Sequence, residues 1–152
     1  MMSKHKDILN KSISIIQAED SLTHKMECIC ELLWSHFDYY DWVGFYLSSN
    51  KEQILHLGPY KGSPTEHLII PFGKGVCGQA AQKKKTILVG DVSQEENYIA
   101  CSTRVKSEIV VPIIKQGKMC GQIDVDSNKI SAFTNQDKKL LERICKEIAN
   151  YF

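Results

Sequence analysis

The chain has 152 residues, a length typical of one domain, and 43% hydrophobic and 24% charged residues, a composition that supports a buried core and excludes an intrinsically disordered chain. The net charge of +1 argues against a nucleic-acid-binding protein, which needs a basic surface. The single basic run, Lys83 to Lys85, is interpreted as a solvated loop. We therefore expect one globular domain over residues 1–152 that binds no nucleic acid.

The N-terminal segment MMSKHKDILNKS lacks the apolar core of a signal peptide. No apolar run approaches the roughly 18 residues of a transmembrane helix. A cytoplasmic location without membrane association is therefore expected. The six cysteines would then lie in a reducing compartment, where structural disulfides are rare, and any disulfide is expected to be transient and catalytic.

The N-terminal part of the chain is predicted to be helical. Apolar residues recur at helical spacing over 3–18 and 22–36. Short β-like runs follow at 42–48, 53–58 and 66–72. The segment 75–84 is interpreted as a short helix entered through glycines, and 86–90 as a strand.

The C-terminal part is predicted to form a β-hairpin and a helix. Residues 107–127 are interpreted as two strands joined by a turn at Gln116-Gly117. Thr134 and Asp137 form a weak capping box before an apolar stripe, which predicts a helix over 135–151. The order helix, helix, β-rich middle, helix predicts an α+β fold, an antiparallel sheet with the N- and C-terminal helices packed on one face.

Four cysteines are assigned no chemistry. Cys28 and Cys30 are two residues apart on a predicted helix and do not share a face, and no second Cys/His pair follows at zinc-site spacing. Cys145 lies beside the apolar stripe of the last helix. These three are interpreted as small hydrophobic residues or incidental thiols. Cys120 faces across the hairpin, where it could also belong to the core.

Cys77 and Cys101 have different surroundings. Cys77 lies in GKGVCG, where a helix is predicted to begin, and the N-terminus of a helix favours the thiolate. The alternative is that these glycines only form a tight turn. Cys101 lies in a polar loop, with Arg104 and Lys106 nearby in sequence as cations that also favour the thiolate. The sequence does not establish whether the two thiols meet.

Three carboxylates are predicted to share one face of the hairpin. Asp124 and Asp126 are two residues apart on one strand, and Glu108 begins the partner strand. Three acids facing an apolar core would be very costly, so this face is either a pocket or solvated. Crowding would raise their pKa values and let one of them act as an acid at neutral pH. A metal site is a further option, although no histidine has matching spacing.

Six segments, in this order, resemble one known family: DWVGFYL, LGPYKG, IPFGKGVCG, YIACS, SEIVVPI and IDVDS. They cover roughly residues 41–127 and, with their spacing, resemble the free methionine-R-sulfoxide reductases, small single-domain GAF proteins. The resemblance implies a GAF fold over 1–152 and thiol-dependent reduction of free L-methionine-(R)-S-oxide to methionine, without a cofactor or metal.

The resemblance implies redox roles for two cysteines. Cys101 would be the nucleophile, left as a sulfenic acid, with which a second thiol condenses to a disulfide. Cys77 would be that second redox cysteine, and thioredoxin or a similar dithiol reductant would restore both thiols. The family commonly has a further cysteine, often the resolving one, ten residues before Cys77, where this chain has His67. We therefore expect Cys77 to resolve the sulfenic acid.

The resemblance also implies a substrate pocket. Glu108, Asp124 and Asp126 would line it, with Glu108 and Asp126 near the sulfoxide oxygen and Asp124 near the substrate ammonium. Trp42 and Tyr46 would wall it around the methyl-sulfoxide end. Two alternatives stay open: a non-catalytic GAF domain that binds a small ligand, and a partner-dependent regulator that senses oxidation. A homodimer is neither required nor excluded by the sequence.

Overall fold

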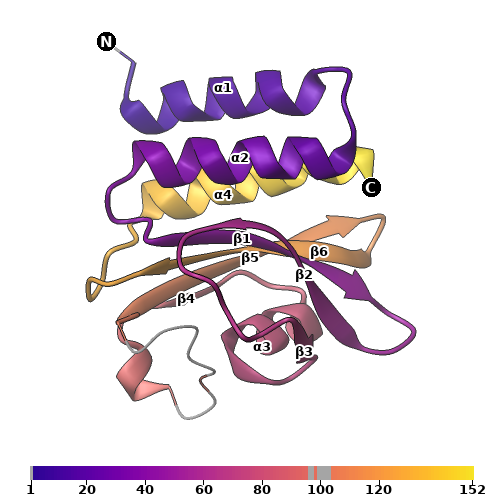
Figure 1. Ribbon diagram of the computed structural model, residues 1–152, viewed down its shortest axis with the longest axis vertical. Coiled ribbons are helices and arrows are strands. Elements are labelled where there is room, and N and C mark those ends of the chain that lie inside the picture. Colours follow the sequence, from indigo (N-terminus) through magenta and orange to yellow (C-terminus); the bar gives the residue numbers. More distant parts are fainter. Residues whose placement is uncertain (1, 96–97, 99–103) are drawn as a thin grey trace.

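The computed structural model describes residues 2–95, 98 and 104–152. Within them it confirms the α+β class: a six-stranded antiparallel sheet with helices on both sides (Figure 1). The helices are α1 (Lys4–Gln17), α2 (Leu22–His36), α3 (Gly75–Lys83) and α4 (Asn135–Ile148). The strands are β1 (Trp42–Ser49), β2 (Ile54–Lys61), β3 (Ile69–Pro71), β4 (Ile87–Val89), β5 (Ser107–Lys115) and β6 (Lys118–Ser127). None of the described helices is both long enough and apolar enough to cross a membrane.

The predicted elements are present, with corrections at their ends. The strand expected over 66–72 shortens to β3, because the chain before it turns: the His67 N–H donates to Thr65 Oγ1 at 3.1 Å and the Leu68 N–H to the Glu66 carbonyl at 3.0 Å. The last helix ends at Ile148 and continues as a 3-10 turn over Ala149–Tyr151. A further 3-10 turn, Val92–Gln94, was not predicted.

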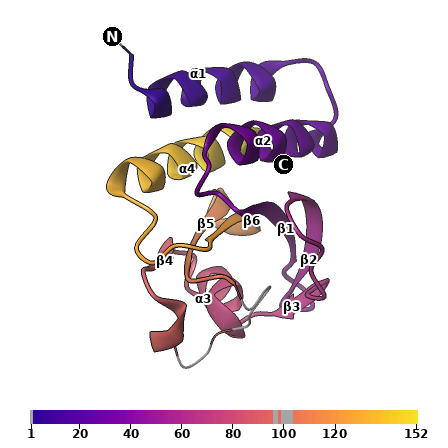
Figure 2. The same ribbon diagram turned by 60° about the vertical axis from the view of Figure 1, so that its left-hand side comes forward.

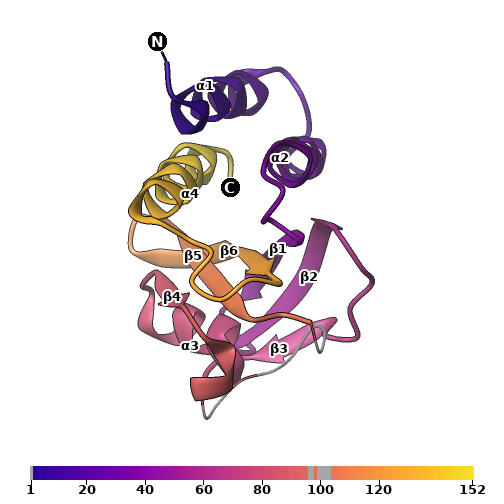
Figure 3. The same cartoon turned by 90° about the vertical axis from the view of Figure 1, so that its left-hand side faces the viewer.

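The sheet has the strand order β3-β2-β1-β6-β5-β4, and its two faces are covered differently. Helices α2 and α4 pack on one face, and α1 packs against both of them on the side away from the sheet (Figure 3). Alternate residues of the strands supply the sheet side of this core: Val43, Phe45, Ile109, Val111, Ile123 and Val125. The other face is covered by α3, which packs against β5 and β6 (Figure 2).

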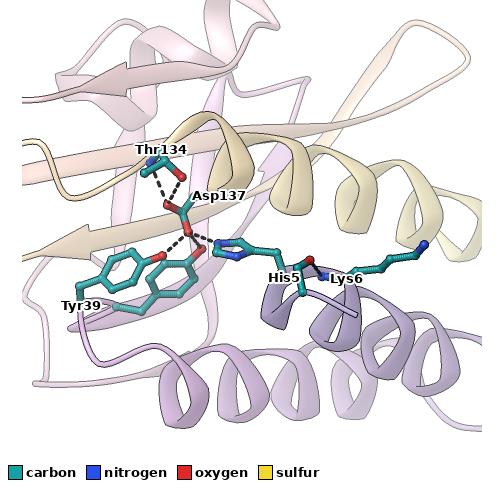
Figure 4. A network of polar contacts seen from close by, with 7 residues as sticks. His5, Lys6, Tyr39, Thr134 and Asp137 are labelled. Atoms are coloured by element: carbon teal, nitrogen blue, oxygen red, sulfur yellow. Dashed lines mark hydrogen bonds and ion pairs between the residues drawn. The ribbon is translucent and has the colours of Figure 1, made fainter. Parts of the chain in front are cut away.

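A buried carboxylate ties the helical layers together. Asp137, the third residue of α4, accepts hydrogen bonds from His5 Nε2 at 2.9 Å, Tyr39 Oη at 2.6 Å and Tyr40 Oη at 2.7 Å (Figure 4). It also accepts from the Thr134 N–H at 2.8 Å and hydroxyl at 3.1 Å, which confirms the predicted capping box. Burial pushes the pKa of Asp137 up, but these bonds outweigh burial and lower it.

The predicted β5–β6 hairpin turns at Gln116 and Gly117, whose φ angles of 51° and 77° are the left-handed values of a tight two-residue hairpin turn. This turn sets the register, in which Glu108 lies opposite Asp126. One irregularity interrupts the ladder, between Ile113 and Ile114, close to the turn. The paired strands therefore run regularly along the length that carries the acidic residues.

Candidate active site

The three predicted carboxylates lie together on the sheet face that α3 covers. Glu108 on β5 is opposite Asp126 on β6, and Asp124 is two residues further along the same strand. All three are buried, with 4%, 0% and 1% of Glu108, Asp124 and Asp126 exposed. The shared face is confirmed, and the alternative of a solvated sheet face is wrong, because a helix closes over it.

Cys77 lies against these acids. It is the third residue of α3, and its thiol donates to Asp124 Oδ2 at 3.4 Å, with Glu108 Oε2 at 3.9 Å. The chain reaches this position through a tight approach at Gly78, where a Cβ would lie 2.5 Å from the Pro71 carbonyl oxygen. The glycines therefore do form a tight turn, and that turn presents the thiol to the acids.

Burial and crowding set the electrostatics of this face. Burial, followed by the charges of Asp124 and Asp126, raises the pKa of Glu108 well above its usual value. Burial also raises the pKa of Asp124, although hydrogen bonds with Glu108, Asp126 and Cys77 offset part of that effect. Protonated carboxyls are thus favoured here, and a protonated carboxyl can donate a proton to a bound oxygen.

The two aromatic residues predicted to wall the substrate pocket, Trp42 and Tyr46, lie on β1, the strand paired with the one that carries Asp124 and Asp126. Trp42 lies opposite Asp126 in the β1–β6 ladder, and its ring stacks on Tyr60 with centroids 5.4 Å apart. Tyr46 is fully buried, and its hydroxyl donates to the His67 carbonyl at 3.0 Å. Gly44 lies between them, where a Cβ would be 2.3 Å from the Trp42 ring. The Trp42 ring therefore lies directly over a position that only glycine leaves open.

Small cavities adjoin the acids on two sides. One has a volume of about 60 Å³ and is lined by Asp41, Trp42, Ser63, Arg104, Val105, Asp126 and Asn128. The other, of about 10 Å³, is lined by His67, Ile70, Lys74, Gly75, Val76, Cys77 and Glu108. A larger groove of about 560 Å³ lies elsewhere, between α4 and β5, and its lining includes several lysines but none of the candidate site residues.

The donor atoms of Cys77, Glu108 and Asp124 lie within 4.8 Å of one another, close enough to share a metal ion. The sequence left a metal site at the three acids as an option, but it did not indicate that Cys77 would join Glu108 and Asp124. Cys77 donates hydrogen bonds to both carboxylates. Gln122 was also missed: its Nε2 donates to the Cys77 carbonyl at 3.0 Å, and its place two residues before Asp124 was the available signal.

The other cysteines differ in burial. Cys101, the predicted nucleophile, lies outside the described residues, so its distance from Cys77 stays a prediction. Cys30 and Cys145 are buried, with 0% and 2% exposed, which confirms their place in the core. Cys28 and Cys120 are half-buried.

Comparison with known proteins places this geometry in context. The GAF domain family model matches residues 20–152. The free methionine-R-sulfoxide reductase of Escherichia coli is 30% identical over 141 residues, 92% of this chain and 84% of the relative. The Saccharomyces cerevisiae enzyme of that name is 46% identical over 110 residues, 71% of this chain and 61% of the relative. The structure of free methionine-R-sulfoxide reductase from Neisseria meningitidis, in complex with its substrate, is similar with a TM-score of 0.93 and 33% identity over 100% of this chain and 92% of that one.

Proposed function

The chain belongs to the GAF-domain proteins, in the family of free methionine-R-sulfoxide reductases, and we propose that it reduces free L-methionine-(R)-S-oxide to methionine. The observation that carries the proposal is the burial of Glu108, Asp124 and Asp126 together beside the Cys77 thiol. Buried carboxyl groups suit a small substrate that carries an ammonium group and an oxygen to be protonated. A buried site also favours the free amino acid over a residue within a peptide.

The first chemical step is thiol attack on the sulfoxide. The Cys101 thiolate attacks the sulfoxide sulfur, and the oxygen, once protonated, transfers to the cysteine as methionine leaves. Cys101 is then a sulfenic acid. Glu108 is the proton donor in this proposal, because burial and its acidic neighbours favour its protonated form. Asp126 lies opposite Glu108 and shares the contact with the sulfoxide oxygen.

Binding of the substrate uses the rest of the face. Asp124 accepts hydrogen bonds from the substrate ammonium, since its Oδ1 is buried and has no donor among the described residues. Trp42 and Tyr46 enclose the methyl group at the sulfoxide end. Both rings are held by neighbours, Trp42 by its stacking on Tyr60 and Tyr46 by its bond to the His67 carbonyl, so this wall is formed before substrate binds.

Regeneration requires a second thiol. In this proposal Cys77 attacks the Cys101 sulfenic acid, forming a disulfide and releasing water, and a dithiol reductant of the thioredoxin type reduces that disulfide. His67 lines the same small cavity as Cys77 but cannot form a disulfide. Cys77 takes the resolving role in this proposal because it is the described thiol that lies beside the acids of the candidate site.

The proposal is tested by measuring methionine. Purified protein is incubated with free methionine-R-sulfoxide and dithiothreitol, and methionine is quantified by amino-acid analysis, with the S epimer and a sulfoxide-containing peptide as comparison substrates. We expect turnover of the free R epimer, loss of turnover in Cys101→Ser, and nearly unchanged turnover in the matched control Cys30→Ser. Absence of methionine, or equal rates on both epimers, would contradict the proposal and favour the non-catalytic sensor.

A further inference from the structure

A row of three side chains, Asp20, His24 and Cys28, lies on the exposed surface at the start of α2, away from the candidate active site. Asp20 precedes the N-cap Ser21, and His24 and Cys28 are four residues apart, the spacing that places two side chains on one stripe of the helix. His24 Nδ1 contacts Asp20 Oδ2, and His24 Nε2 lies 3.6 Å from Cys28 Sγ. The imidazole is thus held between a carboxylate and a thiol, one partner on each ring nitrogen.

This arrangement has the order of partners found where a histidine activates a nucleophile. The carboxylate fixes the ring, so that the nitrogen on the far side faces the sulfur. The hydrogen bond that His24 donates to Asp20 is the main cause that raises the pKa of His24, and the same contact lowers the pKa of Asp20. A more basic imidazole takes the proton of a neighbouring thiol more readily and leaves the thiolate, which is the reactive form of cysteine.

The neighbouring charged residues do not compete with the contact between His24 and the Cys28 thiol. Glu27, on the same helix, adds to the effects that raise the pKa of His24. Glu31, one turn beyond Cys28, is paired with Lys61 of β2 at 3.1 Å. Lys25 is buried and directs its ammonium to the Ile16 carbonyl, away from this stripe. Of these groups His24 is therefore the one in contact with the Cys28 sulfur, and its imidazole is the base that can take the thiol proton.

Solvent can reach the row. The side chains of His24 and Asp20 are 54% and 40% exposed, and Cys28 is half-buried. Cys30, two residues on, faces the core and is fully buried, and burial raises the pKa of its thiol. The two cysteines of this helix therefore differ: Cys30 is buried and unreactive, whereas solvent can reach Cys28. Helix α2 packs on the sheet face opposite the acids (Figure 3), so the row is separate from the candidate active site.

We propose that Cys28 is a second reactive thiol, a modification site that forms mixed disulfides with low-molecular-weight disulfides of the glutathione type. His24 takes the thiol proton, and the Cys28 thiolate attacks one sulfur of the disulfide. The S–S bond of the small molecule breaks, and its other half leaves as a thiolate that takes the proton from His24. The products are a mixed disulfide on Cys28 and one molecule of the small thiol. The small disulfide is itself the oxidant, so no other oxidant is needed.

The chain offers an internal control in Cys120. It is also half-buried, but its thiol donates to the Lys118 carbonyl at 3.6 Å. An ordinary thiol with a pKa near 8.5 is only about 1% thiolate at pH 6.5. At that pH we expect glutathione disulfide to modify Cys28 at least about tenfold faster than Cys120, since only Cys28 has an imidazole beside its sulfur that can take the thiol proton during attack.

The experiment uses the full chain with Cys77→Ser and Cys101→Ser, so that the proposed redox pair does not compete. Reduced protein is mixed with glutathione disulfide, and the modification of Cys28 and Cys120 is followed in the same samples by peptide mass spectrometry. Adding His24→Gln should bring the Cys28 rate to within about twofold of the Cys120 rate. Glutamine favours a helix at least as well as histidine, so α2 should persist, as circular dichroism would verify.

Two results would overturn the proposal: equal rates at Cys28 and Cys120, or a His24→Gln protein whose Cys28 reacts as fast as before. A fast Cys28 that also slows in Asp20→Asn would support the orienting role of the carboxylate. The assay contains no methionine sulfoxide, so its outcome is independent of whether the chain is a reductase.

Discussion

Replacing Asp137 with asparagine is expected to loosen the helical layers without changing their shape. The side chain keeps its size but loses its charge, and one of its two acceptor oxygens becomes an NH₂ group. If the remaining oxygen stays toward His5, Tyr39 and Tyr40, the amide group faces the Thr134 N–H and hydroxyl, which then have no acceptor on this side chain.

The magnitude follows from these contacts. Loss of the bonds from the Thr134 N–H and hydroxyl removes one half of the capping box, which costs about 1 kcal/mol. Loss of the charge weakens three bonds in a side chain that is fully buried, at a further cost of about 1–2 kcal/mol. The free energy of unfolding should therefore fall by about 2–3 kcal/mol. For a domain of this size that corresponds to a fall in Tm of about 4–12 °C.

Thermal and urea unfolding of the two proteins, followed by circular dichroism at several pH values, would measure this difference. The pKa of Asp137 is lowered in the folded protein, so its ionised form stabilises the fold above the unfolded value of about 3.9. That stabilisation is lost as the pH falls through the folded pKa. The difference in the free energy of unfolding between the native protein and Asp137→Asn should have its full value at pH 7 and should decrease below about pH 4.

Asp7→Asn provides the matched control. Asp7 is 47% exposed and pairs with Lys11 at 3.2 Å, so its loss should cost less than about 0.5 kcal/mol. A fall of under about 0.5 kcal/mol in Asp137→Asn as well would refute the reasoning. A difference in the free energy of unfolding that stays constant from pH 7 to pH 3 would also refute it, because the loss of stability would then not depend on the carboxylate charge.

Three further predictions concern the candidate active site. Glu108→Gln keeps the shape but removes the titrating proton, so it should lower kcat more than it raises KM; an unchanged kcat would remove Glu108 from the mechanism. Gly44→Ala would place a Cβ 2.3 Å from the Trp42 ring, so the ring must move and KM for methionine-R-sulfoxide should rise several-fold; a normal KM would show that this ring does not contact substrate. Cys77→Ser should complete one turnover and then stall with thioredoxin, with partial rescue by small thiols, while oxidised native protein should show a Cys77–Cys101 disulfide by mass spectrometry. Sustained thioredoxin-driven turnover in Cys77→Ser would assign regeneration to another thiol.

The parts of the fold set by local periodicity could be predicted from the sequence. Leu141, Ile144 and Ile148 gave the buried face of α4, and all three are in the core. The alternation along β6 put Asp124 and Asp126 on one face, and the turn at Gln116-Gly117 brought Glu108 opposite. These features depend on residues that are near one another in the sequence or are joined by a short turn.

Contacts between distant segments could not be predicted in the same way. Nothing in the GKGVCG segment specifies that α3 lies on the acidic face, so the approach of Cys77 to Asp124 required the tertiary structure. The bond between His5 and Asp137 joins residues 132 positions apart. The Asp20, His24 and Cys28 row is different, because its residues are four apart and their proximity follows from local structure alone.

The register of the β5–β6 hairpin has a consequence for protein engineering. Extra residues introduced at the tip, beside Gly117, would enter open space, because a Cβ there meets nothing within 4 Å. The existing irregularity at Ile113 and Ile114 shows that this end of the ladder already accommodates an offset. A single residue inserted between Glu108 and Ile113 would instead reverse the direction of every side chain on one side of the insertion. Peptide grafts should therefore be tolerated at the tip of this hairpin, whereas one-residue insertions closer to the carboxylates should abolish function.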